Sequence, residues 1–219
     1  VIAANHNDIG IDGIAPEATL VSINALNESD LLYPEALVCA YEWATTHQVD
    51  IVHNSYQMDP WVYWSPTDPE QAAALEAAER AIHRAQSSGL AVIAGSGDRG
   101  VDIDHPTTDS DSPTDSTPIS NRSVEGARMV PAQVSGVVTV SSVGMEDWNA
   151  EPLRATLMRA ERSNYGASVD FAAPGEWIYS TYPNGRIPQI YGYTSGTSTA
   201  AAHVSGIASL VKSVHPMLP

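Results

Sequence analysis

A serine at the start of an alanine-rich segment is the residue in this chain best suited to chemistry. Gly196, Thr197 and Ser198 open a run of small residues that predicts a helix ending near Val214, before Pro216. The first N–H groups of a helix lack partners within it, and the positive end of its dipole favours developing negative charge. A serine oxygen there suits nucleophilic attack. The same residues are also compatible with a glycine-capped packing helix without a chemical role.

A nucleophilic serine needs further groups around it. Its hydroxyl attacks a peptide carbonyl only when a base takes the proton and donors receive the oxyanion. The backbone N–H of Ser198 is the natural first donor. His203 is a poor base, because five residues along a helix is roughly 140° of rotation, so we expect a packing or hydrogen-bonded histidine. The other histidines have no motif around them; they are His6, His47, His53, His83, His105 and His215.

The elements that must position Ser198 alternate along the chain between apolar strands and helices. This pattern is typical of a parallel sheet covered on both faces. Residues 101–130 are polar and punctuated by proline, which favours a solvated insertion. We see no internal repeat and no second domain, so residues 1–219 are expected to form one domain. The predicted strands are 19–26, 49–53, 89–94 and 137–142, and the predicted helices are 34–47 and 70–87.

Composition limits the partners. The formal net charge is −16, with 26 acidic residues, nine arginines and a single lysine, Lys212. So few basic groups argue against nucleic acid or an anionic membrane as partner. There is no apolar run long enough to span a membrane. Low lysine with abundant serine and threonine favours a secreted protein. Cys39 is the only cysteine, and its apolar helical surroundings predict a buried side chain.

Residues 196–206 resemble the nucleophile motif of subtilisin-like serine peptidases, Gly-Thr-Ser-Met-Ala-x-Pro-His-Val-x-Gly. Thr199 replaces the methionine and Ala202 the proline. Four further stretches are similar to the same family in the same order, at 2–16, 50–55, 92–100 and 163–175. The resemblance implies an α/β fold, a three-layer αβα sandwich with a mostly parallel central sheet, incomplete at both ends. It also implies a serine endopeptidase that forms an acyl-enzyme on Ser198.

Two features of the resemblance bear on activity. The family's catalytic Asp and His would precede Val1, so residues 1–219 alone are expected to hydrolyse peptides poorly or not at all. Asp98 stands where the family usually has an asparagine that donates to the oxyanion, and losing one such donor typically costs about 10²–10³ in rate. A protonated Asp98, Arg99 or water would restore a donor. The alternative hypothesis is an inactive domain that binds peptides or propeptides.

The resemblance also implies where ligands bind. A peptide substrate would lie as an extra strand between two cleft segments. Residues 5–11 are similar to the family's calcium loop, in which hard oxygen ligands hold the ion; a plain turn is the alternative. No cofactor is required for the chemistry. An N-terminal propeptide, a monomeric state and secretion are further expectations. The substrate-binding residues are Ser55, Tyr56, Gln57, Gly95, Ser96 and Gly97, and the calcium ligands are Asn5, Asn7, Ile9 and Ile11.

Overall fold

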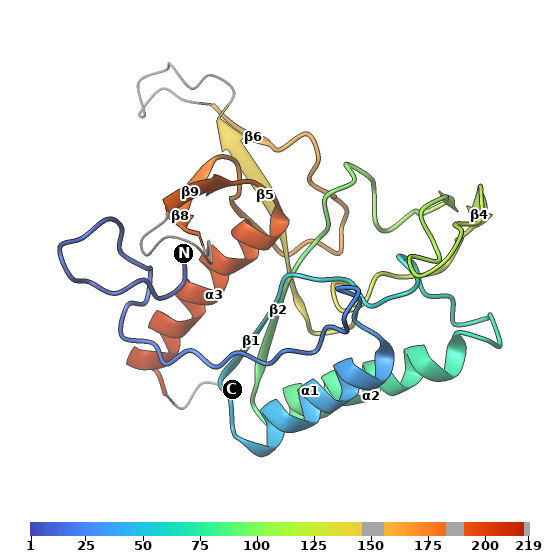
Figure 1. The fold of residues 1–219 in the computed structure, drawn as a ribbon, viewed down its shortest axis with the longest axis horizontal. Helices are drawn as coiled ribbons and strands as arrows, with labels where there is room; N and C mark the ends of the chain where they lie inside the picture. The colour runs from blue at the N-terminus through green and yellow to red at the C-terminus, as the bar shows by residue number, and fades with distance from the viewer. Residues whose placement is uncertain (146–155, 183–190, 217–219) are drawn as a thin grey trace.

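The computed structural model describes residues 1–145, 156–182 and 191–216 (Figure 1). In chain order the elements are α1 (Pro34–Thr46), β1 (Ile51–Asn54), α2 (Ala72–Ser87), β2 (Ala91–Gly95), β3 (Thr108–Asp109), β4 (Arg122–Ser123), β5 (Val138–Met145), β6 (Leu157–Arg159), β7 (Phe171–Pro174), β8 (Ile178–Thr181), β9 (Tyr191–Thr194) and α3 (Thr197–Val214).

The central sheet is mostly parallel. β1 pairs with β2, β2 with β5 and β5 with β7, all in parallel, while β6 runs antiparallel to β5. α1 and α2 lie side by side on one face of this sheet, and α3 lies on the other (Figure 1). The predicted three-layer αβα architecture is therefore confirmed. The predicted helices and the strands expected at 49–53, 89–94 and 137–142 are confirmed as well, with small shifts at their ends.

Alternation along β2 divides the core between the two faces of the sheet. Val92 and Ala94 belong to the larger apolar cluster, which includes residues of α1 and α2. Ile93 points to the opposite face and packs with Ala200 and Ala201 of α3. Because successive strand residues face opposite sides, one short apolar strand serves both layers. The small alanines of α3 let the helix that carries Ser198 sit close to the sheet.

Two predictions that were based on apolar residues are wrong, namely the strand at 19–26 and the burial of Cys39. Residues 19–26 form no strand, and Leu20 and Val21 are 65% and 56% exposed. In the part of the chain that the structure describes, these residues pair with no strand, so their β-forming side chains lack the cross-strand neighbours of a sheet. Cys39 is exposed. It lies two residues, or roughly 200°, beyond the buried Leu37 and therefore on the outer side of α1.

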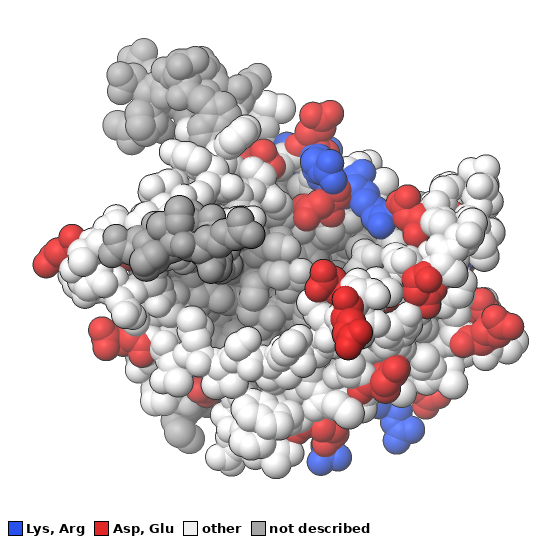
Figure 2. Space-filling model, viewed as in Figure 1, with Lys and Arg blue, Asp and Glu red and all other residues white. Residues whose placement is uncertain are grey.

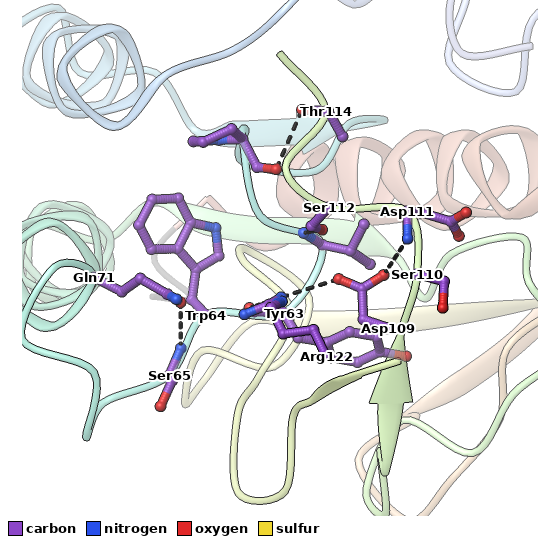
Figure 3. Close-up of polar contacts among 12 residues, drawn as sticks. Tyr63, Trp64, Ser65, Gln71, Asp109, Ser110, Asp111, Ser112, Thr114 and Arg122 are labelled. Atoms are coloured by element: carbon purple, nitrogen blue, oxygen red, sulfur yellow. Dashed lines mark hydrogen bonds and ion pairs between the residues drawn. The ribbon is translucent and has the colours of Figure 1, made fainter. Parts of the chain in front are cut away.

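The segment 101–130 is exposed over much of its length, as expected of a solvated insertion, but it is also tied to the core at several points. Ile103 and Val124 are buried in the larger cluster. Asp109 accepts a hydrogen bond from Arg122 at 3.0 Å, with side chains only 1% and 12% exposed (Figure 3). The guanidinium also lies 4.5 Å from the ring centre of Trp61. The polar composition did not reveal these points of attachment, because buried polar groups such as Asp109 are satisfied by hydrogen bonds beneath the surface.

Candidate active site

Ser198 lies at the beginning of α3, where the chain turns sharply into the helix. Gly196 immediately precedes the helix with φ of 142°, a conformation that other residues rarely adopt. A Cβ atom at this position would also lie only 3.1 Å from Oδ2 of Asp98. Glycine is therefore required here both by the backbone angle and by the close approach of the carboxylate. The turn presents Ser198 as the second residue of the helix, half-exposed to solvent.

The N–H groups at the start of α3 differ in their hydrogen-bond acceptors. That of Thr197 donates to Oδ1 of Asp98 at 2.8 Å. Those of Thr199 and of the residue after it turn back to the carbonyl of Gly196. Ser198 N–H donates to no group in the described ranges. At this helix end, the hydroxyl that would attack and an unused N–H that would receive negative charge thus belong to the same residue.

Asp98 contacts the predicted nucleophile segment as a hydrogen-bond acceptor. Its carboxylate caps α3 from a distant part of the chain, 99 residues before Thr197. A negative charge is favourable at the positive end of a helix, which accounts for this placement. Arg99, a possible substitute donor, is engaged elsewhere, because its guanidinium bonds Asp111. The structure thus places the Asp98 carboxylate at the helix start that carries Ser198, bonded to the residue immediately before it.

An open pocket of about 420 Å³ lies next to Ser198. Its walls come from the first turn of α3, from the paired strands β8 and β9, and from the N-terminal residues. A group that reacts with Ser198 would enter this space. The lining residues are Val1, Ile2, Ala3, Ala4, Leu20, Ser180, Thr181, Thr194, Ser198, Thr199 and Ala202.

His203 lies within α3 and His53 contacts it, and neither has a hydrogen bond to the Ser198 hydroxyl. His203 Nδ1 is 2.9 Å from the carbonyl oxygen of Thr199, which agrees with the prediction of a hydrogen-bonded histidine. His53 has Nε2 2.6 Å from Oγ of Ser55 and Nδ1 3.1 Å from Oγ of Ser205. Sequence analysis gave His53 no role. The only signal was its spacing of two from Ser55, which places both side chains on the same face of an extended segment.

The segment Gly95-Ser96-Gly97 has most of its main-chain groups in use. Ser96 N–H donates to the carbonyl of Val140, and Gly97 N–H donates to Oγ1 of Thr197 at 3.1 Å. The carbonyl of Gly97 accepts the N–H of Asn164 at 2.9 Å. These bonds fix the segment against the start of α3. They also leave it little capacity to pair with an added strand.

The segment 55–57, by contrast, has main-chain groups that are not in use. No main-chain N–H or carbonyl of Ser55, Tyr56 or Gln57 has a bond to a described residue. The side chain of Tyr56 turns inward, and its hydroxyl donates to Oδ1 of Asn54 at 2.6 Å. Burial raises the pKa of Tyr56, so the hydroxyl remains a donor. Tyr56 thus anchors this segment and leaves its backbone available.

Comparison with known proteins gives the family. The sequence pattern of the subtilase family matches residues 1–219. The chain belongs to the subtilase family. It is 30% identical to subtilisin DY of Bacillus licheniformis over 217 residues, which are 99% of this chain and 62% of that relative. The chain thus spans less than two thirds of the length of this relative.

Solved structures of proteases have the same fold. The epidermin leader peptide processing serine protease of Staphylococcus aureus matches with a TM-score of 0.71 and 22% identity, covering 99% of this chain and 52% of that one. Proteases from Pseudoalteromonas arctica match with a TM-score of 0.68 and 26% identity, covering 98% of this chain and 57% of theirs. The resemblance inferred from the collinear motifs is therefore confirmed at the level of family and fold.

The loop predicted to bind calcium lies apart from Ser198 in this subtilase. Its base is closed by the N–H of Gly13, which donates to the carbonyl of Ala4 at 2.9 Å. Asn7 Oδ1 accepts the N–H of Ile9 at 3.2 Å, and the carbonyl of Ile9 accepts the hydroxyl of Tyr191 at 3.4 Å. The carbonyls of Asn5 and Ile11 accept no hydrogen bond from described residues. Amide and carbonyl oxygens are the donor type that calcium prefers, so the residues fit the ion chemically.

The charge distribution agrees with the composition. Acidic side chains are spread over the face shown in Figure 2, and basic ones are few there. Within the described residues, no group of three or more His, Cys, Asp or Glu side chains is arranged to hold a metal ion. The helices in the described ranges include none that is long and apolar enough to cross a membrane.

Proposed function

We propose that this subtilase chain carries the nucleophile and part of the oxyanion site of a serine endopeptidase. The observation that supports this most directly is the combination at Ser198 of a half-exposed hydroxyl and an unused backbone N–H beside an open pocket. Ser198 Oγ forms a bond to the scissile carbonyl carbon, and its N–H donates to the oxygen that becomes negative. The amine product leaves, and water then hydrolyses the acyl-enzyme.

The base in this proposal comes from outside the described residues. No ring nitrogen among them is hydrogen-bonded to the Ser198 hydroxyl. The catalytic Asp and His are those that the family resemblance implies upstream of Val1. A histidine there takes the proton of Ser198 and returns it to the leaving amine, while the aspartate orients the imidazole. Residues 1–219 without those groups are expected to have little or no peptidase activity.

The substrate in this proposal is a polypeptide in extended conformation. The unused main-chain groups of Ser55, Tyr56 and Gln57 support pairing with an added strand. Gly95, Ser96 and Gly97 contribute small side chains to the wall of the cleft. The similar structure from Staphylococcus aureus is that of a leader peptide processing protease, which supports a polypeptide substrate. An N-terminal propeptide in the longer protein is part of the proposal by family resemblance. Secretion and a monomeric state belong to the same proposal.

A structural calcium ion at the loop 5–11 is a further part of the proposal. The side-chain oxygen of Asn7 and the carbonyls of Asn5, Ile9 and Ile11 would hold it, and it would stiffen the loop without taking part in the reaction.

A second candidate function is the binding of peptides or propeptides without hydrolysis. The carboxylate of Asp98, which accepts the N–H of Thr197 at 2.8 Å, favours this alternative. An ionised carboxylate beside the unused N–H of Ser198 repels the charge that develops on the oxyanion. In this alternative the cleft segments and Ser198 remain, but the rate of acyl transfer is very low.

The two functions are separated by labelling the natural protein with a fluorophosphonate and mapping the adduct by mass spectrometry. An adduct that maps to Ser198 and is absent in Ser198→Ala, together with hydrolysis of an unstructured protein such as casein, is the expected result. A folded protein that binds an extended peptide in a fluorescence titration, but forms no adduct on Ser198, contradicts the peptidase and supports the binding function.

A further inference from the structure

The end of β1 brings a histidine and a serine to the surface that faces α3. Strand residues alternate between faces, so Ile51, His53 and Ser55 all project toward α3, while Asn54 projects into the other layer. Ser205 meets them from α3. It lies seven residues, or almost two full turns, beyond Ser198 and therefore on the same side of that helix. Two elements that are far apart in sequence thus build one cluster of three polar side chains.

The hydrogen-bond directions in this cluster define the state of the imidazole. Ser205 Oγ gives its single proton to the carbonyl of Ala201 at 2.9 Å. With its proton on that bond, Ser205 Oγ accepts from His53, and Nδ1 at 3.1 Å is then the protonated nitrogen. Nε2 then has a free lone pair directed at Ser55. This is the tautomer that a general base needs.

Ser55 is the exposed end of this chain of bonds. Its Oγ lies 2.6 Å from Nε2 of His53 and 3.5 Å from the carbonyl oxygen of Ser198. The hydroxyl has one proton, and the shorter contact takes it. The Ser55 oxygen is exposed to solvent, whereas the imidazole behind it is half-buried. Burial lowers the pKa of His53, so the ring is neutral and able to accept a proton at neutral pH.

From this geometry we propose that Ser55 is a second nucleophilic serine of the chain, with His53 as its general base and Ser205 as the residue that positions His53. Ser55 Oγ attacks the carbonyl carbon of an activated ester, and its proton moves to Nε2 of His53. The bond from carbon to the leaving oxygen breaks, and the proton passes to that oxygen as the alcohol departs. The product is an acyl group on Ser55. This inference does not depend on the proposed role of Ser198.

A fluorophosphonate probe tests the nucleophile directly, because Ser55 Oγ would bond phosphorus while fluoride leaves and the proton moves to His53. The experiment uses the chain with Ser198→Ala, which removes the other candidate nucleophile, and measures the labelling rate of each serine by peptide mass spectrometry. Ser22 and Ser87 are internal controls, since both are exposed and neither has a histidine bonded to it. Ser55 is expected to be labelled at least tenfold faster than either, and Ser55→Ala on the same background removes that adduct.

The role of the base is tested with His53→Gln on the same background, after circular dichroism has established that the variant is folded. Labelling of Ser55 is expected to fall at least tenfold. Equal labelling of Ser55, Ser22 and Ser87, or unchanged labelling of Ser55 in folded His53→Gln, would overturn the proposal.

The positioning role of Ser205 has a spectroscopic signature that does not require His53→Gln to fold. In the chain with ¹⁵N-labelled histidine, the nitrogen shifts of His53 are expected to report the Nδ1–H tautomer. In Ser205→Ala they should shift toward a mixture of tautomers, with slower labelling of Ser55. An Nε2–H tautomer in the unmodified His53 ring contradicts the proposal, because Nε2 would then be unable to accept the proton.

Discussion

At the start of α3, Asp98 stands where the family resemblance implies a side-chain donor to the oxyanion, and it contacts the helix through the N–H of Thr197. Its carboxylate has a stabilising role, because it accepts the N–H of Thr197 at the positive end of the helix. The same charge opposes the chemistry proposed for Ser198, since an oxyanion would develop beside it. The stability of the helix start and the rate of acyl transfer therefore place opposite demands on this one residue.

Replacing Asp98 by Asn should preserve the stability of the helix start and increase the rate of acyl transfer. The amide oxygen still accepts the N–H of Thr197, while the amide NH₂ can donate to the oxyanion. We expect kcat of the natural protein on a peptide substrate to rise by about tenfold or more, with little change in KM, because the new interaction is made in the transition state. Asp98→Ala is the control, which should lose the cap and about 1 kcal/mol of stability. A fall in kcat for Asp98→Asn would mean that the carboxyl group itself assists the reaction.

Because the hydroxyl of Tyr56 is buried, the free energy of unfolding is expected to fall as the pH rises into the alkaline range. Tyr41 and Tyr56 both donate to Oδ1 of Asn54, at 3.0 and 2.6 Å, and burial raises the pKa of both hydroxyls. The folded state keeps these protons where the unfolded chain releases them near pH 10. Their contribution is therefore complete below about pH 10 and is lost as pH rises above it.

Tyr56→Phe should therefore have two effects in urea unfolding. At pH 7 the free energy of unfolding falls by about 1 kcal/mol, because one hydrogen bond to a buried amide is lost. Between pH 10 and 11.5 it decreases less steeply than in the unmodified chain. Tyr193→Phe is the matched control, because Tyr193 is 64% exposed and should change neither quantity. Parallel pH curves for Tyr56→Phe and the unmodified chain would contradict this account.

At the residue scale, sequence analysis found what a local motif encodes. Ser198 and Asp98 were identified from runs of neighbouring residues, and the structure places Asp98 against Thr197, the neighbour of Ser198. The contact between His53 and Ser205 joins residues 152 positions apart. It depends on how α3 packs against β1, which no local pattern specifies. The unequal use of backbone groups in the two cleft segments was equally hidden, because those bonds involve distant residues.

At the scale of elements, the segment 101–130 depends on a buried ion pair. Burial alone would raise the pKa of Asp109, but hydrogen bonds from Ser112, from the N–H of Asp111 and from Arg122 outweigh it and lower that pKa. The contribution of the ionised carboxylate is therefore present above about pH 4 and is lost as the pH falls below that value. Because β3 and β4 are only two residues long each, this pair and its neighbours hold the segment in place.

Arg122→Gln should be strongly destabilising. It leaves the Asp109 carboxylate buried without its charged partner, which typically costs about 3–5 kcal/mol. The control is Arg99→Gln, whose partner Asp111 is 64% exposed and whose loss should cost about 1 kcal/mol or less. Guanidinium unfolding at pH 7 measures both, and amide hydrogen exchange of residues 101–130 shows whether the change is local. Similar costs for the two variants would contradict a special role for the buried pair.

Periodicity predicted the helices well and the apolar strands less well. α1 and α2 have apolar residues at helical spacing and lie within two residues of their predicted limits. Residues 19–26 have the side chains of a strand, but a strand also requires a neighbour with which to pair, and hydropathy does not contain that information. The segment 101–130 is exposed over much of its length, as predicted, but polar composition did not show that Asp109 and Ser112 are buried and hydrogen-bonded.

At the scale of the whole molecule, the net charge of −16 affects any test of cation binding. Divalent ions screen repulsion among acidic side chains whether or not they occupy a site, and this general effect favours the compact state. Figure 2 shows acidic side chains distributed over the visible face, so such screening would not be confined to one loop. A specific calcium site must therefore give stabilisation beyond that of an equal ionic strength of sodium chloride.

Specific calcium binding can be distinguished from general screening by comparing two similar turns, one in the calcium loop and one outside it. Asn7 Oδ1 accepts the N–H of Ile9 at 3.2 Å, and Asn24 Oδ1 accepts the N–H of Leu26 at 3.3 Å. We expect calcium at a hundred times its dissociation constant to stabilise the chain by about 2.7 kcal/mol, measured as a higher thermal midpoint than in sodium chloride of equal ionic strength. Asn7→Ala should lose most of this gain and Asn24→Ala should keep it, because both variants lose a similar turn but only one loses a proposed ligand. Equal loss in the two variants, or a gain matched by sodium chloride, would assign the effect to turn stability or screening and remove the site from the proposal.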